Sequence, residues 1–192
     1  MAEIKIPDIL LHDCKNCQGL CCVALEHRIE EGFPLLADKP LGVPCQHLAT
    51  SPEGSQVGIY KCMIHSHLLQ AGWPTCKEFT CHGAGQAVSQ FFKELGISWA
   101  EKPTEPDQVL KWEIQKTNMQ IAYRVLNAAL AILEKGLSGG WISVFVYFRA
   151  LEVVKRVSLE FSTTLNTATS VIDEKFWNEQ KFEAAIYTAM FG

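Results

Sequence analysis

The residues with the clearest chemical potential are the cysteines, which crowd into the first part of the chain. Four of them occupy nine positions with the spacing C-x2-C-x3-C-C, and the other four follow by residue 81. Thiolates bind soft and borderline metals, and a C-x2-C step brings two sulfurs within reach of one ion. We therefore expect all eight to serve as metal ligands: Cys14, Cys17, Cys21, Cys22, Cys45, Cys62, Cys76 and Cys81.

Two details of this pattern bear on how the ligands are shared. Adjacent side chains point about 100° apart on a helix and to opposite sides of a strand, so Cys21 and Cys22 are not expected to bind one ion together. One of them should face a second site or act as a small buried side chain. His65 follows Cys62 in a C-x2-H step and is the histidine best placed to add a nitrogen ligand.

The cysteine motifs, taken in order, resemble a widespread bacterial family of zinc- or iron-chelating cysteine-cluster domains. The matching motifs are Cys14-x2-Cys17-x3-Cys21-Cys22, Pro44-Cys45-x2-Leu48, Cys62-x-Ile64-His65 and Cys76-x2-Phe79-x-Cys81. His65 stands where tyrosine is the common choice of that family, so its role as a ligand does not follow from the resemblance. The stretch as far as Gln86 is also similar to the Cys-rich heads of some pentapeptide-repeat proteins, although no such repeats follow it. The resemblance covers about residues 13–86 and implies chelation by the cysteines, without specifying a reaction.

The metal and its purpose stay open at this level. Zinc suits paired chelating steps and would fold a loop-rich segment, whereas an iron–sulfur cluster suits several thiolates close in sequence with a distant fourth. The leading interpretation is a metal-binding module that holds zinc or iron. The alternatives are an iron–sulfur-dependent redox or transfer enzyme and a thiol redox sensor. No catalytic constellation can be identified in the sequence.

Composition narrows the classes of protein. The chain has 192 residues, 48% of them hydrophobic, and a formal net charge of −4 without a run of basic residues. We therefore expect no nucleic-acid partner. Its apolar runs are far shorter than the roughly 18 residues that suggest a membrane span. The start does not resemble a signal peptide, so we expect a cytoplasmic protein, where cysteine clusters are more often metal-binding than disulfide-bonded.

The elements that must position these thiols change in character near residue 85. Residues 1–85 contain many glycines and prolines and predict an irregular Cys-rich head, with a short strand within 58–64 and two helical turns within 65–71. Residues 86–192 have helical periodicity and predict an antiparallel helical bundle packed against the head. The expected fold class is therefore mainly α.

The bundle should contain four helices, and their ends are suggested by capping residues. Helices are expected at 86–95, 105–135 and about 141–161, followed by a last helix. Thr104 is the expected N-cap of the second helix and Gly136 its end, while Ser170 and Asp173 precede the last helix, on which Phe176 and Phe182 share a face. One apolar stripe of the second helix comprises Leu110, Ile114, Ile121, Val125, Ala128 and Ile132.

Overall fold

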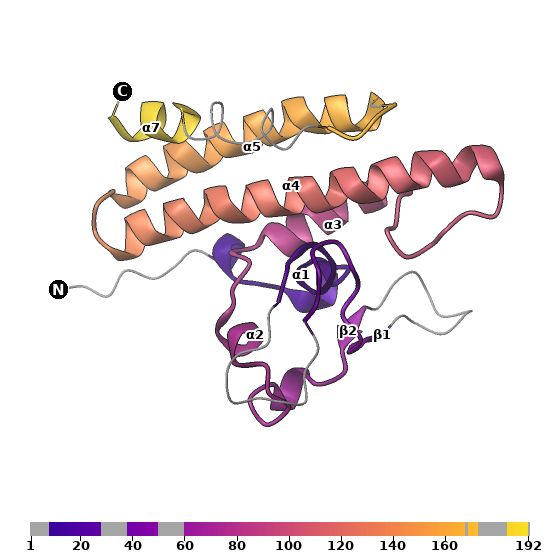
Figure 1. Cartoon of the computed structure of the whole chain (residues 1–192). Coiled ribbons are helices and arrows are strands. Elements are labelled where there is room, and N and C mark those ends of the chain that lie inside the picture. Colours follow the sequence, from indigo (N-terminus) through magenta and orange to yellow (C-terminus); the bar gives the residue numbers. More distant parts are fainter. Residues whose placement is uncertain (1–7, 28–37, 50–59, 168, 173–183, 192) are drawn as a thin grey trace.

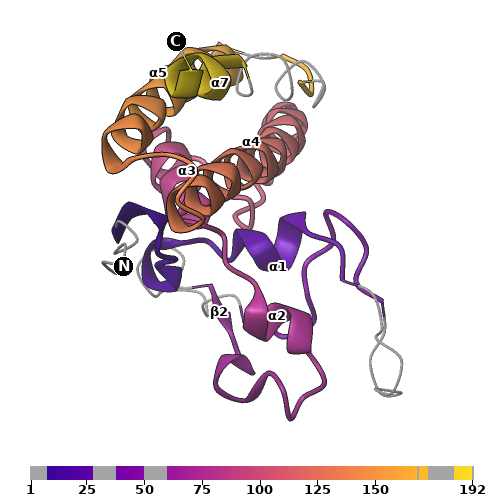
Figure 2. The same cartoon turned by 90° about the vertical axis from the view of Figure 1, so that its left-hand side faces the viewer.

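The computed structural model describes residues 8–27, 38–49, 60–167, 169–172 and 184–191. The fold is mainly α-helical, as predicted, and its helices form layers (Figures 1 and 2). The longer helices all follow the last cysteine: α3 (Ala84–Glu94), α4 (Pro106–Ser138), α5 (Val144–Thr167) and α7 (Ala184–Phe191). The short elements of the cysteine-containing part lie on the other side of α4 from α5 and α7 (Figure 2).

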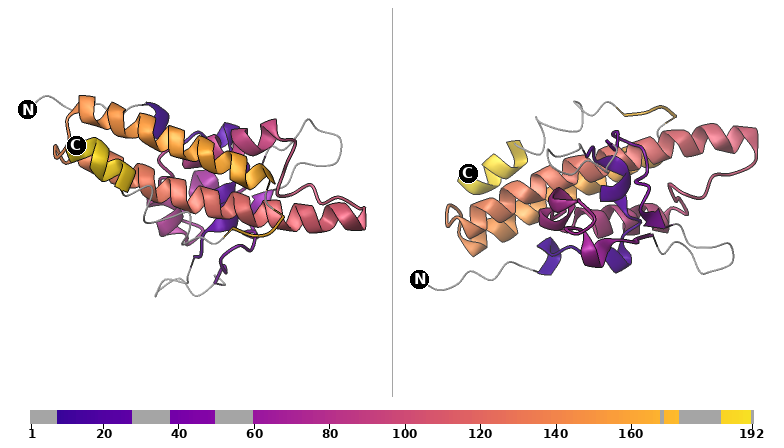
Figure 3. Two further views of the ribbon diagram at one scale, coloured as in Figure 1. Left: turned by 90° about the horizontal axis from the view of Figure 1, so that it is seen from above. Right: turned by 60° about the horizontal axis from the view of Figure 1, so that its bottom comes forward.

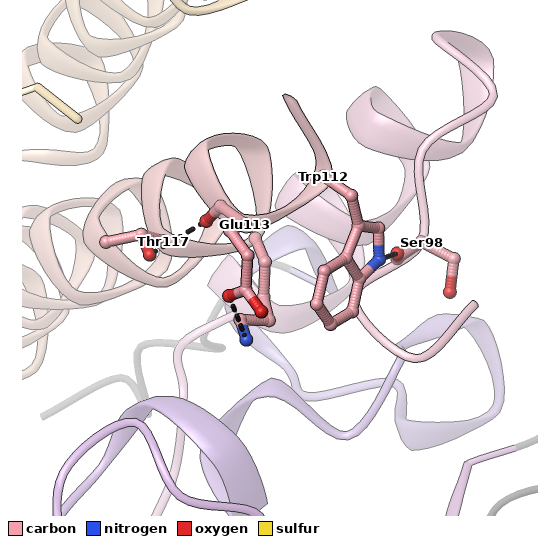
Figure 4. Close-up of polar contacts among 5 residues, drawn as sticks. Ser98, Trp112, Glu113 and Thr117 are labelled. Atoms are coloured by element: carbon pink, nitrogen blue, oxygen red, sulfur yellow. Dashed lines mark hydrogen bonds and ion pairs between the residues drawn. The ribbon is translucent and has the colours of Figure 1, made fainter. Parts of the chain in front are cut away.

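Helix α4 is the central element, and α5 runs back along it in the opposite direction (Figure 3). Helix α3 also packs against α4, and α7 packs against α5. The start of α4 is fastened to the segment after α3 by Trp112, whose Nε1 donates a hydrogen bond to the backbone oxygen of Ser98 over 2.9 Å (Figure 4). On the next turn, Glu113 forms an ion pair with Lys116 and accepts a hydrogen bond from Thr117 through its backbone oxygen.

Both predicted ends of α4 need correction. The residue before the first turn is Glu105 rather than Thr104, and its side chain makes no capping hydrogen bond. Pro106 occupies the first helical position, where its missing N–H costs nothing. The helix also continues through Gly136 to Ser138. Gly136 is kept inside the helix because the side chain of Ile142 packs on it, and a Cβ there would lie 3.2 Å from Ile142 Cδ1.

The predicted apolar stripe on α4 is correct in its middle and wrong near its ends. Ile121 and Val125 are buried, whereas Leu110 and Ile132 are 66% and 44% exposed. Leu110 lies on the first turns of α4, which extend beyond the end of α5 (Figure 1). Burial therefore follows the partners that cover this long helix, which its periodicity alone does not reveal.

The cysteine-containing part is built from short elements. They are η1 (Asp8–Leu10), η2 (Cys14–Asn16), α1 (Leu20–Ala24), β1 (Leu48–Ala49), β2 (Lys61–Cys62), η3 (His65–His67) and α2 (Pro74–Glu78). β1 and β2 pair antiparallel, with Leu48 opposite Cys62. Within the described residues, the strand expected in 58–64 is reduced to β2. Of the two helical turns expected in 65–71, the first forms as η3. The second is a hydrogen-bonded turn, in which the N–H of Ala71 donates to the oxygen of His67, outside any regular helix.

One hydrophobic core joins the short elements to the long helices. Leu20 and Val23 of α1 belong to the same buried cluster as Met119 and Leu133 of α4. Trp99 adds a polar connection, because its Nε1 donates a hydrogen bond to the buried backbone oxygen of Gln18 over 2.7 Å. The expected boundary at residue 85 is where the long helices begin, and it stays a prediction as a domain division.

Two expectations about the last helix concern residues outside the described ranges. These residues are Asp173, which pairs with Ser170 in the expected cap, and Phe176 and Phe182, which are expected to share a face. Among the helices that the structure describes, none has the length and apolarity needed to cross a membrane.

Candidate metal centre

All eight cysteines carry free thiols, and they lie in the part of the fold below α4 in Figure 2. They come from η2, α1, β2, α2 and the loops between them. Backbone contacts close the arrangement: the N–H of Cys45, for example, donates to the oxygen of Cys22 over 2.8 Å. Each of the other seven thiols interacts electrostatically with Cys21.

The sulfurs of Cys21 and Cys22 lie close together, while the expectation that the two do not bind one ion together stays a prediction. Their Sγ atoms lie 4.0 Å apart within α1. The two Cβ atoms do diverge around a helix, but rotation about each Cα–Cβ bond can bring the sulfurs back together. Two thiolates bound to one tetrahedral zinc at about 2.3 Å are themselves roughly 3.8 Å apart. The observed separation is therefore suitable for a shared ion.

A second group of thiols lies against the start of α3. A Cβ on Gly85 would fall 2.8 Å from the Sγ of Cys17 and 3.4 Å from that of Cys81, so both sulfurs sit over this glycine. Backbone N–H groups of Gly85 and Gly83 donate toward Cys81, and Ser89 donates toward Cys17. N–H groups at a helix start favour negative charge, so this position suits thiolates.

The proton equilibria of the thiols differ across the site. Burial raises the pKa of Cys17 to about 11 and that of Cys76 to about 12. The pKa of Cys62 is instead lowered to about 6, because the thiol of the more buried Cys22 donates a hydrogen bond to its thiolate. Most of the thiols are therefore protonated near neutral pH, and a metal ion would have to displace those protons to bind.

Lys39 places a positive charge inside this part of the protein. Its side chain is buried, and its Nζ donates to the backbone oxygens of Val23, Leu25 and Pro40. Burial lowers the pKa of Lys39, while the neighbouring thiol groups, Cys45 first among them, oppose that shift. A buried ammonium beside several cysteines would offset the negative charge of thiolates.

The histidine that meets a cysteine is His27. Both of its ring nitrogens lie 3.8 Å from the Sγ of Cys76, and its ring packs edge-on against Trp73. His65 has an exposed side chain, and among the described residues no hydrogen bond joins it to a thiol. Sequence reasoning overlooked His27 because the cysteine that it contacts, Cys76, lies 49 residues away in the chain, so no local spacing signals the contact.

In this structure the side chains do not form a complete set of metal ligands. Among the described residues, no three His, Cys, Asp or Glu side chains are close enough together to hold one ion. The donors nevertheless fit a soft or borderline metal in their chemistry: free thiols, N–H donors and a buried cation beside them. The metal role predicted for the eight cysteines and His65 therefore stays a prediction, with His27 as a further candidate.

Comparisons with known proteins add a partial relative. No protein-family model and no solved structure matches this chain. The chain is similar to the uncharacterized protein YybG of Bacillus subtilis (strain 168), with 36% identity over 112 residues, which cover 56% of this chain and 36% of that protein. The match thus spans little more than a third of the relative, whose name states no activity, and any function must be argued from the residues themselves.

Proposed function

We propose that this protein binds zinc or iron through the cysteines of its first 85 residues, as a metal-binding module. The observation that carries this proposal is the gathering of eight free thiols from distant parts of the chain around Cys21. Thiolates brought this close together repel one another: after burial, their mutual charge is a further cause of the raised pKa values of Cys14 and Cys45. A metal cation would reverse that repulsion into attraction.

The surroundings of the thiols support the same interpretation. A divalent ion with four thiolates carries a net charge of −2, and the ammonium of Lys39 would offset part of it. The start of α3 would stabilise the thiolates of Cys17 and Cys81. Zinc would cross-link loops that have few regular elements, and an iron–sulfur cluster would use the same sulfurs for redox or transfer chemistry.

A thiol redox sensor is the second candidate, and one observation favours it. Cys62 has a pKa of about 6 and lies beside Cys22, so a reactive thiolate stands next to a second thiol. A peroxide could oxidise this pair to a disulfide, the two sulfurs losing two electrons and two protons while the peroxide is reduced to water or alcohol. Such a protein would work without a metal.

The test is the metal content of the full chain purified without oxygen, measured with its visible absorption spectrum. We expect zinc or iron at one or more ions per chain, with sulfide and broad visible absorption if iron is present as a cluster. Metal-free protein in which all eight thiols react freely would contradict the proposal and favour the redox sensor.

Two variants locate the metal within the protein. Cys21→Ser should lose most of the metal while the helical circular dichroism signal of the long helices persists. His67→Ala is the matched control and should retain the wild-type metal content, since its side chain is exposed and it is outside the predicted ligand set. Full metal content in Cys21→Ser would contradict the central role of Cys21.

A further inference from the structure

Cys21 and Cys22 form a pair of adjacent free thiols in α1, and their Sγ atoms lie 4.0 Å apart. Both residues are partly exposed, so a small molecule can reach the pair from solvent. A disulfide would require the two sulfurs to approach to about 2.05 Å. Sulfurs that are bonded to one shared atom stay farther apart, roughly 3.8 Å in the case of a tetrahedral zinc. The observed separation is therefore close to that of two sulfurs bridged by a single atom.

The backbone that carries the pair is fixed on both sides. The N–H of Cys22 donates to the oxygen of Gly19 over 2.9 Å, and the oxygen of Cys22 accepts from the N–H of Cys45 over 2.8 Å. Leu20 and Val23, which flank the two cysteines in the chain, are 0% and 1% exposed and belong to the hydrophobic core. Because the pair is already held in place, little conformational freedom is lost when both sulfurs bind the same atom.

The number of donors limits the kind of ligand that this pair can hold by itself. In the part of the chain that the structure describes, no three His, Cys, Asp or Glu side chains are close enough together to hold one ion. A structural zinc ion takes four ligands, so two sulfurs supply only half of its coordination. Trivalent arsenic forms covalent bonds to thiols, and an arsenical with one organic substituent has two positions left for sulfur. Two neighbouring thiols are therefore all that such a ligand requires.

We propose that Cys21 and Cys22 bind trivalent arsenicals with one organic substituent, as a dithiol chelate on α1. The arsenical reacts in its dihydroxy form, in which arsenic carries two hydroxyl groups and the organic group. Each As–O bond is replaced by an As–S bond, and each departing hydroxide leaves as water with the proton of one thiol. Arsenic stays trivalent, so no oxidant or reductant is consumed. The inference goes beyond the proposed function, since it requires reduced thiols and no metal ion.

Two conservative variants separate the pair from the other thiols. Cys22→Ser removes one sulfur of the chelate and leaves Cys21 with a single As–S bond to offer. Cys14→Ser is the matched control, because it also removes one thiol from the same part of the chain but leaves the pair intact. Cys14 is exposed on η2, so its replacement by serine changes little packing.

The experiment uses phenylarsine oxide as the probe and the full chain, reduced and stripped of metal. A small dithiol of known arsenic affinity competes for the probe, and intact-protein mass spectrometry measures how much stays bound. We expect Cys22→Ser to lower the affinity of the tightest site by about a hundredfold or more, because the second As–S bond of the wild type forms within one molecule. Cys14→Ser should match the wild type.

A second measurement on the wild type does not depend on any variant. One equivalent of phenylarsine oxide is bound, the remaining thiols are blocked with N-ethylmaleimide, and the peptides are mapped by mass spectrometry. Cys21 and Cys22 should be the two cysteines that escape blocking. Protection spread evenly over the other cysteines, or equal affinities of Cys22→Ser and Cys14→Ser, would overturn the inference. Either result leaves the proposed metal-binding function to its own test, which is the metal content of the purified protein.

Discussion

Gly85 makes a quantitative prediction that does not depend on any metal. At an ordinary helical position, Gly→Ala gains up to about 1 kcal/mol of stability. Here the new Cβ would lie 2.8 Å from Cys17 Sγ, which is roughly 1 Å closer than a relaxed contact. Overpacking of this kind costs about 1–3 kcal/mol. Gly85→Ala should therefore lower the free energy of unfolding by about 0–2 kcal/mol instead of raising it.

A double-mutant cycle isolates the clash from the helix propensity. Cys17→Ala removes the Sγ and leaves the Cβ of residue 17 at 3.6 Å, which is an ordinary contact. In that background Gly85→Ala should raise stability by up to about 1 kcal/mol. The two changes should thus be coupled by about 1–3 kcal/mol, as measured by urea unfolding of the metal-free, reduced protein.

The cycle can refute the reasoning directly. If Gly85→Ala changes the free energy of unfolding by the same amount in both backgrounds, within about 0.5 kcal/mol, then the sulfur of Cys17 does not lie over Gly85. The same measurement with Cys81→Ala gives a graded control. Its Sγ would be 3.4 Å from the new Cβ, so its removal should relieve much less strain.

Three further predictions concern the cysteine-containing part of the fold. In the metal-free protein at pH 7, iodoacetamide should modify Cys62, whose pKa is about 6, well before Cys17, whose pKa is about 11. Mass spectrometry of the peptides gives the order of modification. Equal rates at the two cysteines would contradict this difference in pKa. Trp99→Phe should lower the free energy of urea unfolding by about 2–4 kcal/mol, because the buried carbonyl of Gln18 loses its hydrogen bond and a void remains. Trp141→Phe is the control at a position that is 78% exposed, and it should stay within about 0.5 kcal/mol of the wild type. Lys39→Met should lower the free energy of unfolding by about 2–4 kcal/mol, because three backbone carbonyl groups lose a charged donor. An unchanged free energy in the same assay would argue against a buried ammonium at this position.

The helices were the part of the fold that the sequence could predict. Apolar residues that recur every three or four positions indicate α3, α4 and α5 without knowledge of any neighbour. Their ends and exposed sides depend on tertiary contacts, which is why Gly136 remained inside α4 and Leu110 proved exposed. Periodicity describes one helix at a time, whereas burial of a side chain also depends on the element that packs against that helix.

The site shows a similar division. Spacing could identify the eight cysteines as a group, but it could not show that the sulfurs of Cys21 and Cys22 turn toward each other, because that depends on rotamers. His27 and Lys39 have no motif around them, so only the folded chain reveals that they lie near thiols.

The shared core also has a consequence for biosynthesis. Roughly one hundred residues separate Cys22 from Tyr123, so the thiols leave the ribosome well before the helix that will cover them. At about 5–20 residues per second, that interval lasts about 5–20 s. During this time α1 lacks α4 as a packing partner, and its sulfurs are open to solvent, oxidants and metal donors alike. A metal ion that binds these thiols would therefore have its easiest access on the nascent chain, before α4 packs on α1.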